Sequence, residues 1–503
     1  MNNKLHYFFL FLIVFIGFIL RTYRLSDIPH GFFCDEASIG YNAYSILNSG
    51  RDEYGVSLPI FFQSFGEYKS PIEVYSTVPF VGLFGLSEFA TRLPSTIYGL
   101  ITIIIMYFIG KEISSNKSGY FGLLTAFITS TMPWLIHYNR IAFELTSYPA
   151  FFTFTMLVLI RAARHKSFII PGFIFSALTF YSYSPAKLFV PLLLLGVLLI
   201  YRKMYFTHKK EIGAGLLAFF ILSIPLVLSF FNGAGIARFN MVSVFSAKLS
   251  FTQSVLRIVQ NYIVQLSPSY FISGEPTFIT RHFIEGLTPL LITTLPFALI
   301  GLIHTFLTMK NNKSMQLLMY WLIIYPVAGA ITASAPFTSR SIIGAPLFAI
   351  LISTGITTTV LHARKFIHSY ILVSIIIVVI LSNLAFFTRF YLIQYPLYSA
   401  DFWGWQYGAR DIVHYFVTQE SKYDELIMAP EFNAPEIFFK FYAPNDCKKC
   451  KIGTPDTIGN SNLKQLFAVT PTYINNHLTK FLIKKTIYYP NKTIAFQIGE
   501  VAQ

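Results

Sequence analysis

Residues 369–388 decide the fold: they read SYILVSIIIVVILSNLAFFT and contain no charged side chain. A helix of about 20 mostly apolar residues spans the hydrocarbon core of a bilayer. Comparable stretches recur along the chain. We interpret eleven as membrane spans: 7–20, 95–110, 119–136, 148–160, 168–181, 188–201, 212–231, 287–306, 315–333, 341–360 and 369–388. The sequence therefore predicts an α-helical polytopic membrane protein with about 11 transmembrane helices.

The composition of the 503 residues excludes a single water-soluble core. Hydrophobic residues make up 54% of the chain and charged residues only 12%, whereas soluble domains carry about 25% charged residues. The formal net charge of +15 could indicate a nucleic-acid partner. A chain this apolar fits a basic membrane protein better. We therefore expect membrane lipids as partners and no nucleic-acid partner.

The distribution of positive charge predicts the orientation. If the N-terminus lies inside, the short inner loops hold 14 Lys and Arg residues against only Glu112 and Glu211. The positive-inside rule therefore predicts a multi-pass protein of the plasma or inner membrane with a cytoplasmic N-terminus. Residues 72–86 are also apolar, but counting them as a span would reverse every later loop. We expect them to form a helix at the outer interface. The inner loops are 1–6, 111–118, 161–167, 202–211, 309–314 and 362–368.

This topology divides the chain into two domains. Residues 1–388 form the transmembrane domain, with a long first external loop at 21–94, and residues 389–503 form a small extracytoplasmic α/β domain. The latter is expected to contain a helix near 408–419, an extended stretch at 423–429 and a helix opening at 433–436. Its Cys447 and Cys450 favour a local disulfide over free thiols or half of a metal site.

Candidate catalytic residues gather in the first external loop. Asp35 and Glu36 follow the first span, and burial beside aromatic residues would raise a carboxyl pKa toward the range of a general base. The alternative is an acidic pair that only favours a helix N-terminus. Lys69 lies where the loop returns to the membrane, after Glu67 and Tyr68. It suits an anionic phosphate, or it snorkels to the interface.

Other external cations are candidates for phosphate binding. Arg92 lies at the mouth of the second span and Arg340 precedes the tenth, with interfacial anchoring as the alternative role of each. Arg140 and Glu144 are four residues apart, so they would lie on one face of a helix if this loop is helical. The alternative is a simple surface ion pair. Weaker candidates are Lys187, Arg281 and His282.

Together these motifs resemble glycosyltransferase family 39, the polyprenyl-phosphate-sugar-dependent transferases. This family includes the protein O-mannosyltransferases and the aminoarabinose transferases that modify lipid A. The chain departs from the family in three ways: Lys-Ser-Pro replaces Lys-Pro-Pro, Glu144 replaces Asp, and Tyr68 separates Glu67 from Lys69. The resemblance covers roughly residues 1–410. It rests on Asp35-Glu36, Lys69-Ser70-Pro71, the phrase from Phe84 to Ser95, Arg140 with Glu144, Arg340, and Trp405-Gln406-Tyr407-Gly408.

The resemblance implies a C-type glycosyltransferase fold and a reaction. A mannose- or aminoarabinose-like sugar, a hexosyl or pentosyl group, would pass from a polyprenyl-phosphate donor to an acceptor hydroxyl on the extracytoplasmic side, with inversion. The acceptor would be a protein, a lipid or a glycan. A divalent metal is compatible with this reaction but not required, and no other cofactor is implied.

The resemblance also implies roles for individual residues. Asp35 would be the general base, with Glu36 and Glu144 orienting the acceptor or the sugar. Other substrate contacts would come from Glu67, Tyr68, Arg140 and His282. The donor phosphate would be bound by Lys69, Arg92, Arg340 and Lys187.

A transporter or flippase of lipid-linked sugars is the alternative function. Transporters place ionisable residues inside their spans and are built from repeated halves. In this sequence the candidate charges lie in external loops and we find no internal repeat. This pattern favours the enzyme.

Overall fold

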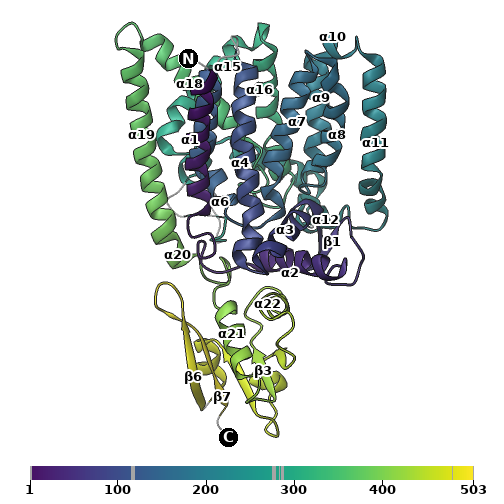
Figure 1. Cartoon of the computed structure of the whole chain (residues 1–503), viewed down its shortest axis with the longest axis vertical. Helices are drawn as coiled ribbons and strands as arrows, with labels where there is room; N and C mark the ends of the chain where they lie inside the picture. Colours follow the sequence, from purple (N-terminus) through teal and green to yellow (C-terminus); the bar gives the residue numbers. More distant parts are fainter. Residues whose placement is uncertain are drawn as a thin grey trace.

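The computed structural model describes residues 3–114, 119–247, 249–274, 279–282, 284, 288–478 and 480–501. Long helices run side by side in a bundle, and the smaller C-terminal domain, with both helices and strands, lies beyond one end of this bundle (Figure 1). The N-terminus lies at the opposite end of the bundle. This arrangement confirms the helical membrane architecture with a small C-terminal α/β domain.

Seven helical segments are long and apolar enough to cross a membrane in the described part of the chain. All seven coincide with predicted spans, although residue 287, where the eighth predicted span begins, lies outside the described residues. The helices of these segments are α1 (Asn3–Thr22), α4 (Glu88–Ile113), α7 (Tyr148–Ala162), α11 (Lys209–Phe231), α15 (Leu295–Thr308), α18 (Gly344–Ala363) and α19 (Ser369–Arg389).

The remaining four predicted spans are short or interrupted helices. Two are short: α8 (Ile169–Thr179) and α9 (Ala186–Ile200). The other two break next to a proline, which cannot donate a backbone hydrogen bond. Pro133 begins α6 (Pro133–Tyr138), directly after the break that follows α5 (Gly119–Thr131), and Pro326 lies in the break between α16 (Lys313–Ile324) and α17 (Val327–Ala330). The count of eleven spans therefore stays a prediction.

The first external loop is itself folded. It contains α2 (Cys34–Ser49), a hairpin of β1 (Phe62–Ser64) and β2 (Glu67–Lys69), and α3 (Pro71–Phe84). Helix α2 lies across the end of the bundle (Figure 1), and α3 packs against both α2 and α4. The apolar residues 72–86 thus form a helix, as predicted, that is not among the seven long ones.

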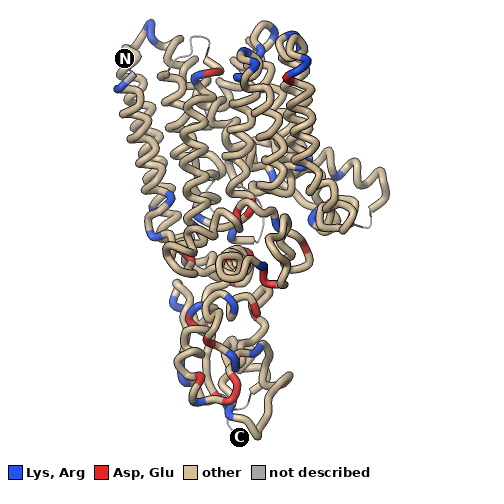
Figure 2. Tube along the Cα trace, turned by 45° about the vertical axis from the view of Figure 1, so that its right-hand side comes forward, with Lys and Arg blue, Asp and Glu red and all other residues tan. Residues whose placement is uncertain are grey.

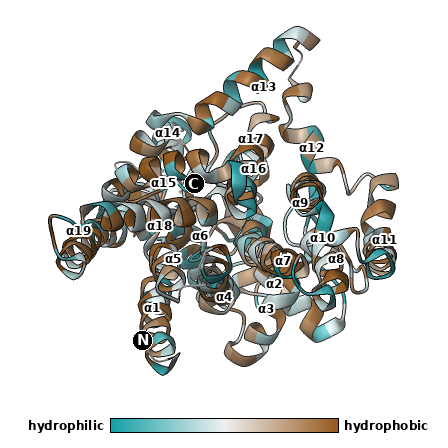
Figure 3. Cartoon of the chain, turned by 90° about the horizontal axis from the view of Figure 1, so that it is seen from above, coloured by the Kyte–Doolittle hydropathy of each residue, from teal (hydrophilic) through white to brown (hydrophobic). Residues whose placement is uncertain are grey.

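The second long loop contains α12 (Ala237–Val242), α13 (Phe251–Leu266) and α14 (Pro268–Ser273). Helix α13 projects from the side of the bundle (Figure 3). Its polar side faces the protein, where Asn261 Nδ2 donates to the carbonyl of Thr332 at 2.7 Å, while Leu256, Val259 and Ile263 are exposed. An outward apolar side is typical of a helix in contact with lipid.

Lysine and arginine residues gather at the end of the bundle that carries the N-terminus (Figure 2). The opposite end and the C-terminal domain carry both signs of charge. This separation is the one expected from the loop charges. Which end faces the cytoplasm stays a prediction, as does the domain boundary at residue 388.

The C-terminal domain follows a helical turn, α20 (Tyr395–Tyr398), that extends α19. Its five-stranded sheet has the order β4-β3-β5-β7-β6, with β4, β3 and β5 parallel and β7 antiparallel to β5 and β6. The three expected elements are present as α21 (Ala409–Gln419), β3 (Glu425–Met428) and α22 (Glu436–Tyr442). Cys447 and Cys450 form the expected disulfide. The other elements are β4 (Cys450–Ile452), α23 (Pro455–Ile458), β5 (Gln465–Val469), α24 (Pro471–His477), β6 (Phe481–Tyr488) and β7 (Ile494–Val501).

Helix α22 docks the C-terminal domain onto the first external loop. A Cβ atom at Gly40 of α2 would lie 2.5 Å from the Phe441 ring, so glycine allows the two helices to approach closely. Lys440 Nζ lies 2.9 Å from Glu53 Oε2, and the Tyr442 hydroxyl donates to Glu88 Oε1 at 2.5 Å. These contacts place residues of the small domain beside the middle of α2, the loop that follows it and the start of α4.

Candidate active site

A cavity of about 340 Å³ lies where the first external loop meets the end of the bundle. The N-terminal turn of α2, the β1–β2 hairpin and the short helix η1 (Glu144–Thr146) form part of its wall. Six of its polar residues are among the candidates predicted from the sequence: Asp35, Glu67, Lys69, Glu144, Arg281 and His282. The charged and strongly polar lining residues are Asp35, Glu67, Lys69, Glu144, Arg238, Arg281, His282 and Asn433.

Asp35 and Lys69 form an ion pair in this cavity. Lys69 Nζ lies 2.9 Å from Asp35 Oδ1 and donates to Ser64 Oγ at 2.7 Å. The Lys69 side chain is 6% exposed and that of Asp35 is 31% exposed. Asp35 occupies the first turn of α2, where a carboxylate is favoured, and Lys69 ends β2. The pair joins two motifs that the sequence keeps apart.

The ion pair reverses the expected pKa shift of Asp35. Burial raises the pKa of this carboxyl, as we predicted, but the charge and hydrogen bond of Lys69, together with the charges of Arg238 and Arg281, outweigh burial, so the pKa lies below its ordinary value. The pKa of Lys69 is shifted upward, because Asp35 outweighs the lowering effect of burial. Asp35 is therefore ionised at neutral pH and able to accept a proton.

Strand alternation explains the spacing of Glu67, Tyr68 and Lys69. Residues two apart in a strand point to the same face, so Glu67 and Lys69 both line the cavity while Tyr68 does not. Glu67 Oε2 pairs with Arg238 Nη1 at 2.5 Å. Although Tyr68 separates them in the sequence, the Glu67 and Lys69 side chains therefore lie on the same face of β2. The structure does not bring Tyr68 to the cavity, and its substrate contact stays a prediction.

Glu144 lines the cavity at the start of η1. Its Oε2 accepts a hydrogen bond from the backbone N–H of Ser70 at 2.7 Å, which ties η1 to the Lys69-Ser70-Pro71 motif. Arg140 and Glu144 do not share a helix, because α6 ends at Tyr138. The expected pairing of Arg140 with Glu144 is therefore absent among the described contacts.

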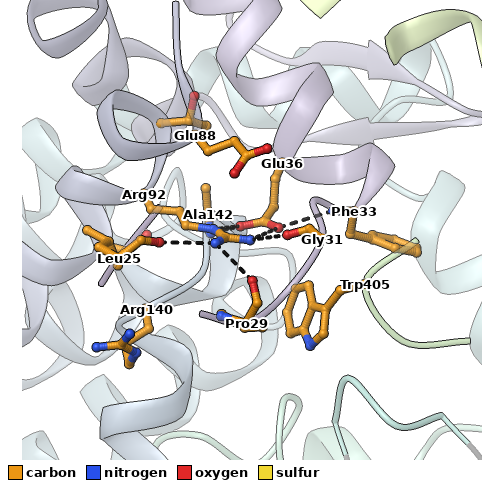
Figure 4. Close-up of polar contacts among 12 residues, drawn as sticks. Leu25, Pro29, Gly31, Phe33, Glu36, Glu88, Arg92, Arg140, Ala142 and Trp405 are labelled. Atoms are coloured by element: carbon orange, nitrogen blue, oxygen red, sulfur yellow. Dashed lines mark hydrogen bonds and ion pairs between the residues drawn. The ribbon is translucent and has the colours of Figure 1, made fainter. Parts of the chain in front are cut away.

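Glu36 and Arg92 pair with each other away from the cavity (Figure 4). Arg92 Nε lies 2.8 Å from Glu36 Oε1 and Arg92 Nη2 lies 3.0 Å from Glu36 Oε2, with both side chains fully buried. Glu36 also accepts from the backbone N–H of Ala142, and Arg92 donates to the carbonyls of Leu25 and Gly31. Neither residue lines the cavity and each is engaged by the other, so this geometry does not support the predicted roles in catalysis and phosphate binding, which stay predictions.

Arg140 is fully buried and likewise donates hydrogen bonds to backbone carbonyls. It donates to Leu20, Tyr23 and Ile28 at 2.7–3.0 Å. Arg92 and Arg140 together fix the segment between α1 and α2. The structure therefore shows Arg140 supporting this segment and does not bring it to the cavity, and its substrate contact stays a prediction.

His282 lines the cavity as predicted, beside Arg281. Burial lowers the pKa of His282 well below its ordinary value, so the imidazole is neutral, and its Nδ1 lies 3.3 Å from the Tyr138 hydroxyl. The Arg281 guanidinium lies 3.9 Å from the centre of the Phe33 ring and donates to the carbonyl of Trp403. Both residues form the wall on the side of the later loops.

A second pocket of about 310 Å³ lies next to the first. Its wall is mostly apolar, with Phe230, Ile236 and Phe239 among its residues, and it carries the predicted cations Lys187 and Arg340. Lys187 Nζ donates to the carbonyl of Gly235 at 2.8 Å. Tyr183 and Arg238 line both pockets. The pocket with Lys187 and Arg340 and the cavity with Asp35 and Lys69 thus share the wall formed by Tyr183 and Arg238.

Two further residues of the cavity, Arg238 and Asn433, were not predicted from the sequence. Arg238 is one of few cations in the long second external loop, and that scarcity is the signal that could have identified it. Asn433 belongs to the C-terminal domain, and nothing in the sequence indicates that this domain reaches the cavity.

The carboxylates of the cavity do not form a metal site in the described residues. No group of three or more His, Cys, Asp or Glu residues is close enough together there to hold a metal ion. Asp35 is paired with Lys69 and Glu67 with Arg238. We therefore derive no catalytic step through a metal.

Comparison with protein families matches residues 69–228 to the family described as dolichyl-phosphate-mannose-protein mannosyltransferase. No curated protein sequence matches the chain. This matched segment contains Lys69, Arg92, Arg140 and Glu144, which supports the resemblance drawn from these motifs.

Solved structures share the fold over nearly the whole chain. ArnT from Cupriavidus metallidurans in the apo state has a TM-score of 0.55 at 10% identity, covering 97% of each chain. ArnT bound to undecaprenyl phosphate has a TM-score of 0.52 at 10% identity, covering 99% of this chain and 98% of that one. The Archaeoglobus fulgidus oligosaccharyltransferase tethered with an acceptor peptide has a TM-score of 0.51 at 11% identity, covering 100% and 74%.

At 10–11% identity the solved structures show the fold alone. The family match concerns the sequence of residues 69–228. Both agree with the resemblance inferred from the first external loop. The chain therefore has the C-type glycosyltransferase fold, and its residues 69–228 are similar to the mannosyltransferase family.

Proposed function

We propose that this protein transfers a sugar from a polyprenyl-phosphate donor to an acceptor hydroxyl. The observation that carries the proposal is the shared wall of the two pockets. An apolar pocket with Lys187 and Arg340 adjoins, at Tyr183 and Arg238, a polar cavity with Asp35. A polyprenyl-phosphate sugar has the same order of parts: an apolar chain, an anionic phosphate and a polar sugar.

The donor would lie across this wall. Its isoprenoid chain packs in the apolar pocket, its phosphate meets Arg238 and Arg340, and its sugar enters the cavity. Arginine suits this role because its guanidinium stays charged and binds phosphate oxygens in pairs. The undecaprenyl phosphate bound to ArnT, which shares the fold, supports a donor of this class.

The reaction is an inverting displacement at the anomeric carbon. The acceptor oxygen forms a bond to this carbon as the bond to the phosphate oxygen breaks, through a transition state with oxocarbenium character. Asp35 accepts the proton of the acceptor hydroxyl. The phosphodiester becomes a monoester and gains negative charge, which Lys69, Arg238 and Arg340 stabilise.

Glu36 and Arg92 act as positioning residues in this scheme. Glu36 neighbours Asp35 in α2 and accepts from the N–H of Ala142, two residues before Glu144. This contact fixes the distance between the first turn of α2 and η1. Asp35 and Glu144 therefore face the same cavity in a defined arrangement.

The proposed location is the plasma or inner membrane, with the site and the C-terminal domain on the extracytoplasmic side. The gathering of Lys and Arg at the opposite end supports this orientation (Figure 2). A lipid-linked donor suits that side, because the isoprenoid chain stays in the bilayer and brings an activated sugar to the outer surface. The sugar would be mannose- or aminoarabinose-like and the acceptor a hydroxyl of a protein, lipid or glycan.

The test uses the full chain in proteoliposomes. Radiolabelled mannosyl- and aminoarabinosyl-phosphoryl-undecaprenol are supplied with a cell-envelope fraction as acceptor. We expect label in the envelope fraction, and some as free sugar from transfer to water. Donor that crosses the bilayer without reacting would contradict the proposal and favour a flippase.

A further inference from the structure

Asn433 is the residue through which the C-terminal domain reaches the cavity, among the described residues that line it. It lies in the segment 429–435, the β3–α22 loop, which follows the carboxyl end of β3. Strand β3 is flanked by the parallel strands β4 and β5. In sheets of parallel strands, ligands bind beyond the carboxyl ends of the strands. The loop therefore occupies a position suited to recognition.

The Asn433 side chain is available for a ligand. It is exposed, and it makes no hydrogen bond or ion pair with any residue that the structure describes. By contrast, Asp35 and Glu67 in the same cavity are held by Lys69 and Arg238. A carboxamide offers two N–H donors and one oxygen acceptor, the complement of a hydroxyl group.

The β3–α22 loop is held in place by its neighbours. Phe432 is 5% exposed and stacks on Phe496 with ring centres 5.1 Å apart. Ala434 has φ of 48°, a left-handed conformation that residues with a side chain rarely adopt. Backbone of this kind persists where surrounding packing enforces it, often at functional sites. Asn433 is thus presented to the cavity between two fixed residues.

The loop and the apolar pocket belong to different parts of the molecule. That pocket is lined from α9, α11, α12 and α17, which belong to the bundle and its second long loop, whereas the C-terminal domain lies beyond the end of the bundle (Figure 1). In an inverting displacement the acceptor attacks the face of the sugar opposite the phosphate. A donor that enters from the bundle leaves the side of Asn433 for the acceptor.

We infer that Asn433 is a specificity-determining residue that hydrogen-bonds a hydroxyl-bearing acceptor, and that the β3–α22 loop forms the acceptor side of the site. This inference rests on the proposed function. It assigns the recognition of the acceptor to the C-terminal domain and the recognition of the donor to the transmembrane domain.

The test compares Asn433→Ala with the wild-type full chain in proteoliposomes. The radiolabelled donors described above are used with a cell-envelope fraction from cells that lack this protein, and water serves as a competing acceptor. We expect the apparent KM for the envelope acceptor to rise about tenfold, equivalent to about 1.4 kcal/mol. The KM for the donor and the rate of release of free sugar should stay within about twofold.

Two further variants separate recognition from folding. Asn445→Ala removes another exposed carboxamide of the same domain, which donates to the Tyr44 hydroxyl outside the cavity, and should leave the acceptor KM unchanged. Asn433→Gln keeps the carboxamide and should recover part of the affinity. An acceptor KM that rises equally in Asn445→Ala would assign the effect to domain docking and overturn the inference.

The outcomes also distinguish this inference from the proposed function. If the wild-type protein transfers label but Asn433→Ala has the wild-type acceptor KM, the inference alone fails. The same conclusion follows if donor KM and release of free sugar change in step with transfer. If the wild-type protein moves no label to the envelope fraction or to water, the proposed function fails and the inference fails with it.

Discussion

Lys69 Nζ lies 2.9 Å from Asp35 Oδ1, so the candidate base and a candidate phosphate ligand form one ion pair in the cavity. The pair connects the first turn of α2 to the end of the β1–β2 hairpin. It keeps the carboxylate ionised and the ammonium charged before any substrate arrives. Proton transfer to Asp35 and charge development on the phosphate would therefore act on the same pair.

Asp35→Asn is expected to abolish transfer while leaving binding of the donor largely intact. An amide cannot accept the proton of the attacking hydroxyl, and loss of a general base lowers rates by about 10²- to 10⁴-fold. The measurement is the initial rate of label transfer at saturating donor. Asp27→Asn, in the same loop and 45% exposed, is the matched control and should transfer normally. Near-normal turnover in Asp35→Asn would remove Asp35 as the base.

Lys69→Met is expected to move the acid limb of the pH–rate profile to higher pH. The base works when ionised, so activity falls as the pH drops through its pKa. In the wild-type protein the ion pair holds the pKa of Asp35 below its ordinary value. Without Lys69 the charges of Arg238 and Arg281 still lower the pKa of Asp35, but the main opposition to burial is lost, and burial raises the pKa of a carboxyl. A limb at the same pH in both proteins would show that Lys69 does not control Asp35.

Arg92→Ala is expected to lower stability more than donor affinity. Removing one partner of a buried ion pair costs about 3–5 kcal/mol, because the other charge is left buried and unpaired. The measurements are Tm in detergent and binding of undecaprenyl phosphate. Arg51→Ala, an exposed arginine of the same loop, should change neither quantity. An unchanged Tm with weaker binding would instead restore the phosphate-binding role predicted for Arg92.

Arg238→Gln is expected to weaken binding of undecaprenyl phosphate about tenfold or more, because a hydrogen bond to a charged group contributes about 1.5–3 kcal/mol. The Arg238 side chain is 44% exposed, so the fold should tolerate the change. Arg257→Gln on the exposed side of α13 is the control. Equal affinities in both variants would exclude Arg238 as a phosphate ligand.

Cysteine labelling tests the orientation. Cys447 and Cys450 form a disulfide in the C-terminal domain, and the free Cys34 is 1% exposed. After mild reduction of intact cells, we expect a membrane-impermeant maleimide to label the pair, and Cys450→Ser with Cys447→Ser to abolish labelling. Labelling that occurs only in inverted vesicles would reverse the predicted topology.

The spans and the small domain could be predicted because their signals are local. A continuous apolar stretch such as 369–388 specifies a helix in lipid without reference to the rest of the chain. The same reasoning predicts one continuous helix where the structure has two, because the helix breaks next to Pro133 and next to Pro326. Helix α13 escaped prediction because its apolar residues are spaced along one face and never form a continuous run.

The site could be predicted only in part. Asp35, Lys69 and Glu144 were identified from residue type and motif, and all three line the cavity. Glu36 and Arg92 satisfied the same criteria, yet they pair with each other in the interior. A carboxylate or guanidinium has the same appearance in a sequence whether it meets a substrate or a buried partner. The sign of the Asp35 pKa shift was wrong for the same reason, since it depends on the partner.

The sequence by itself determined that the chain is a polytopic helical membrane protein, where its positive loops lie, and which loop carries the reactive motif. These properties follow from apolar transfer and from charge, which act on each segment independently. Only the tertiary structure decided that Asp35 meets Lys69, that Arg238 joins two pockets and that Asn433 reaches the cavity. Those relationships arise between segments far apart in the chain, and packing alone brings them within hydrogen-bonding distance or around a common cavity.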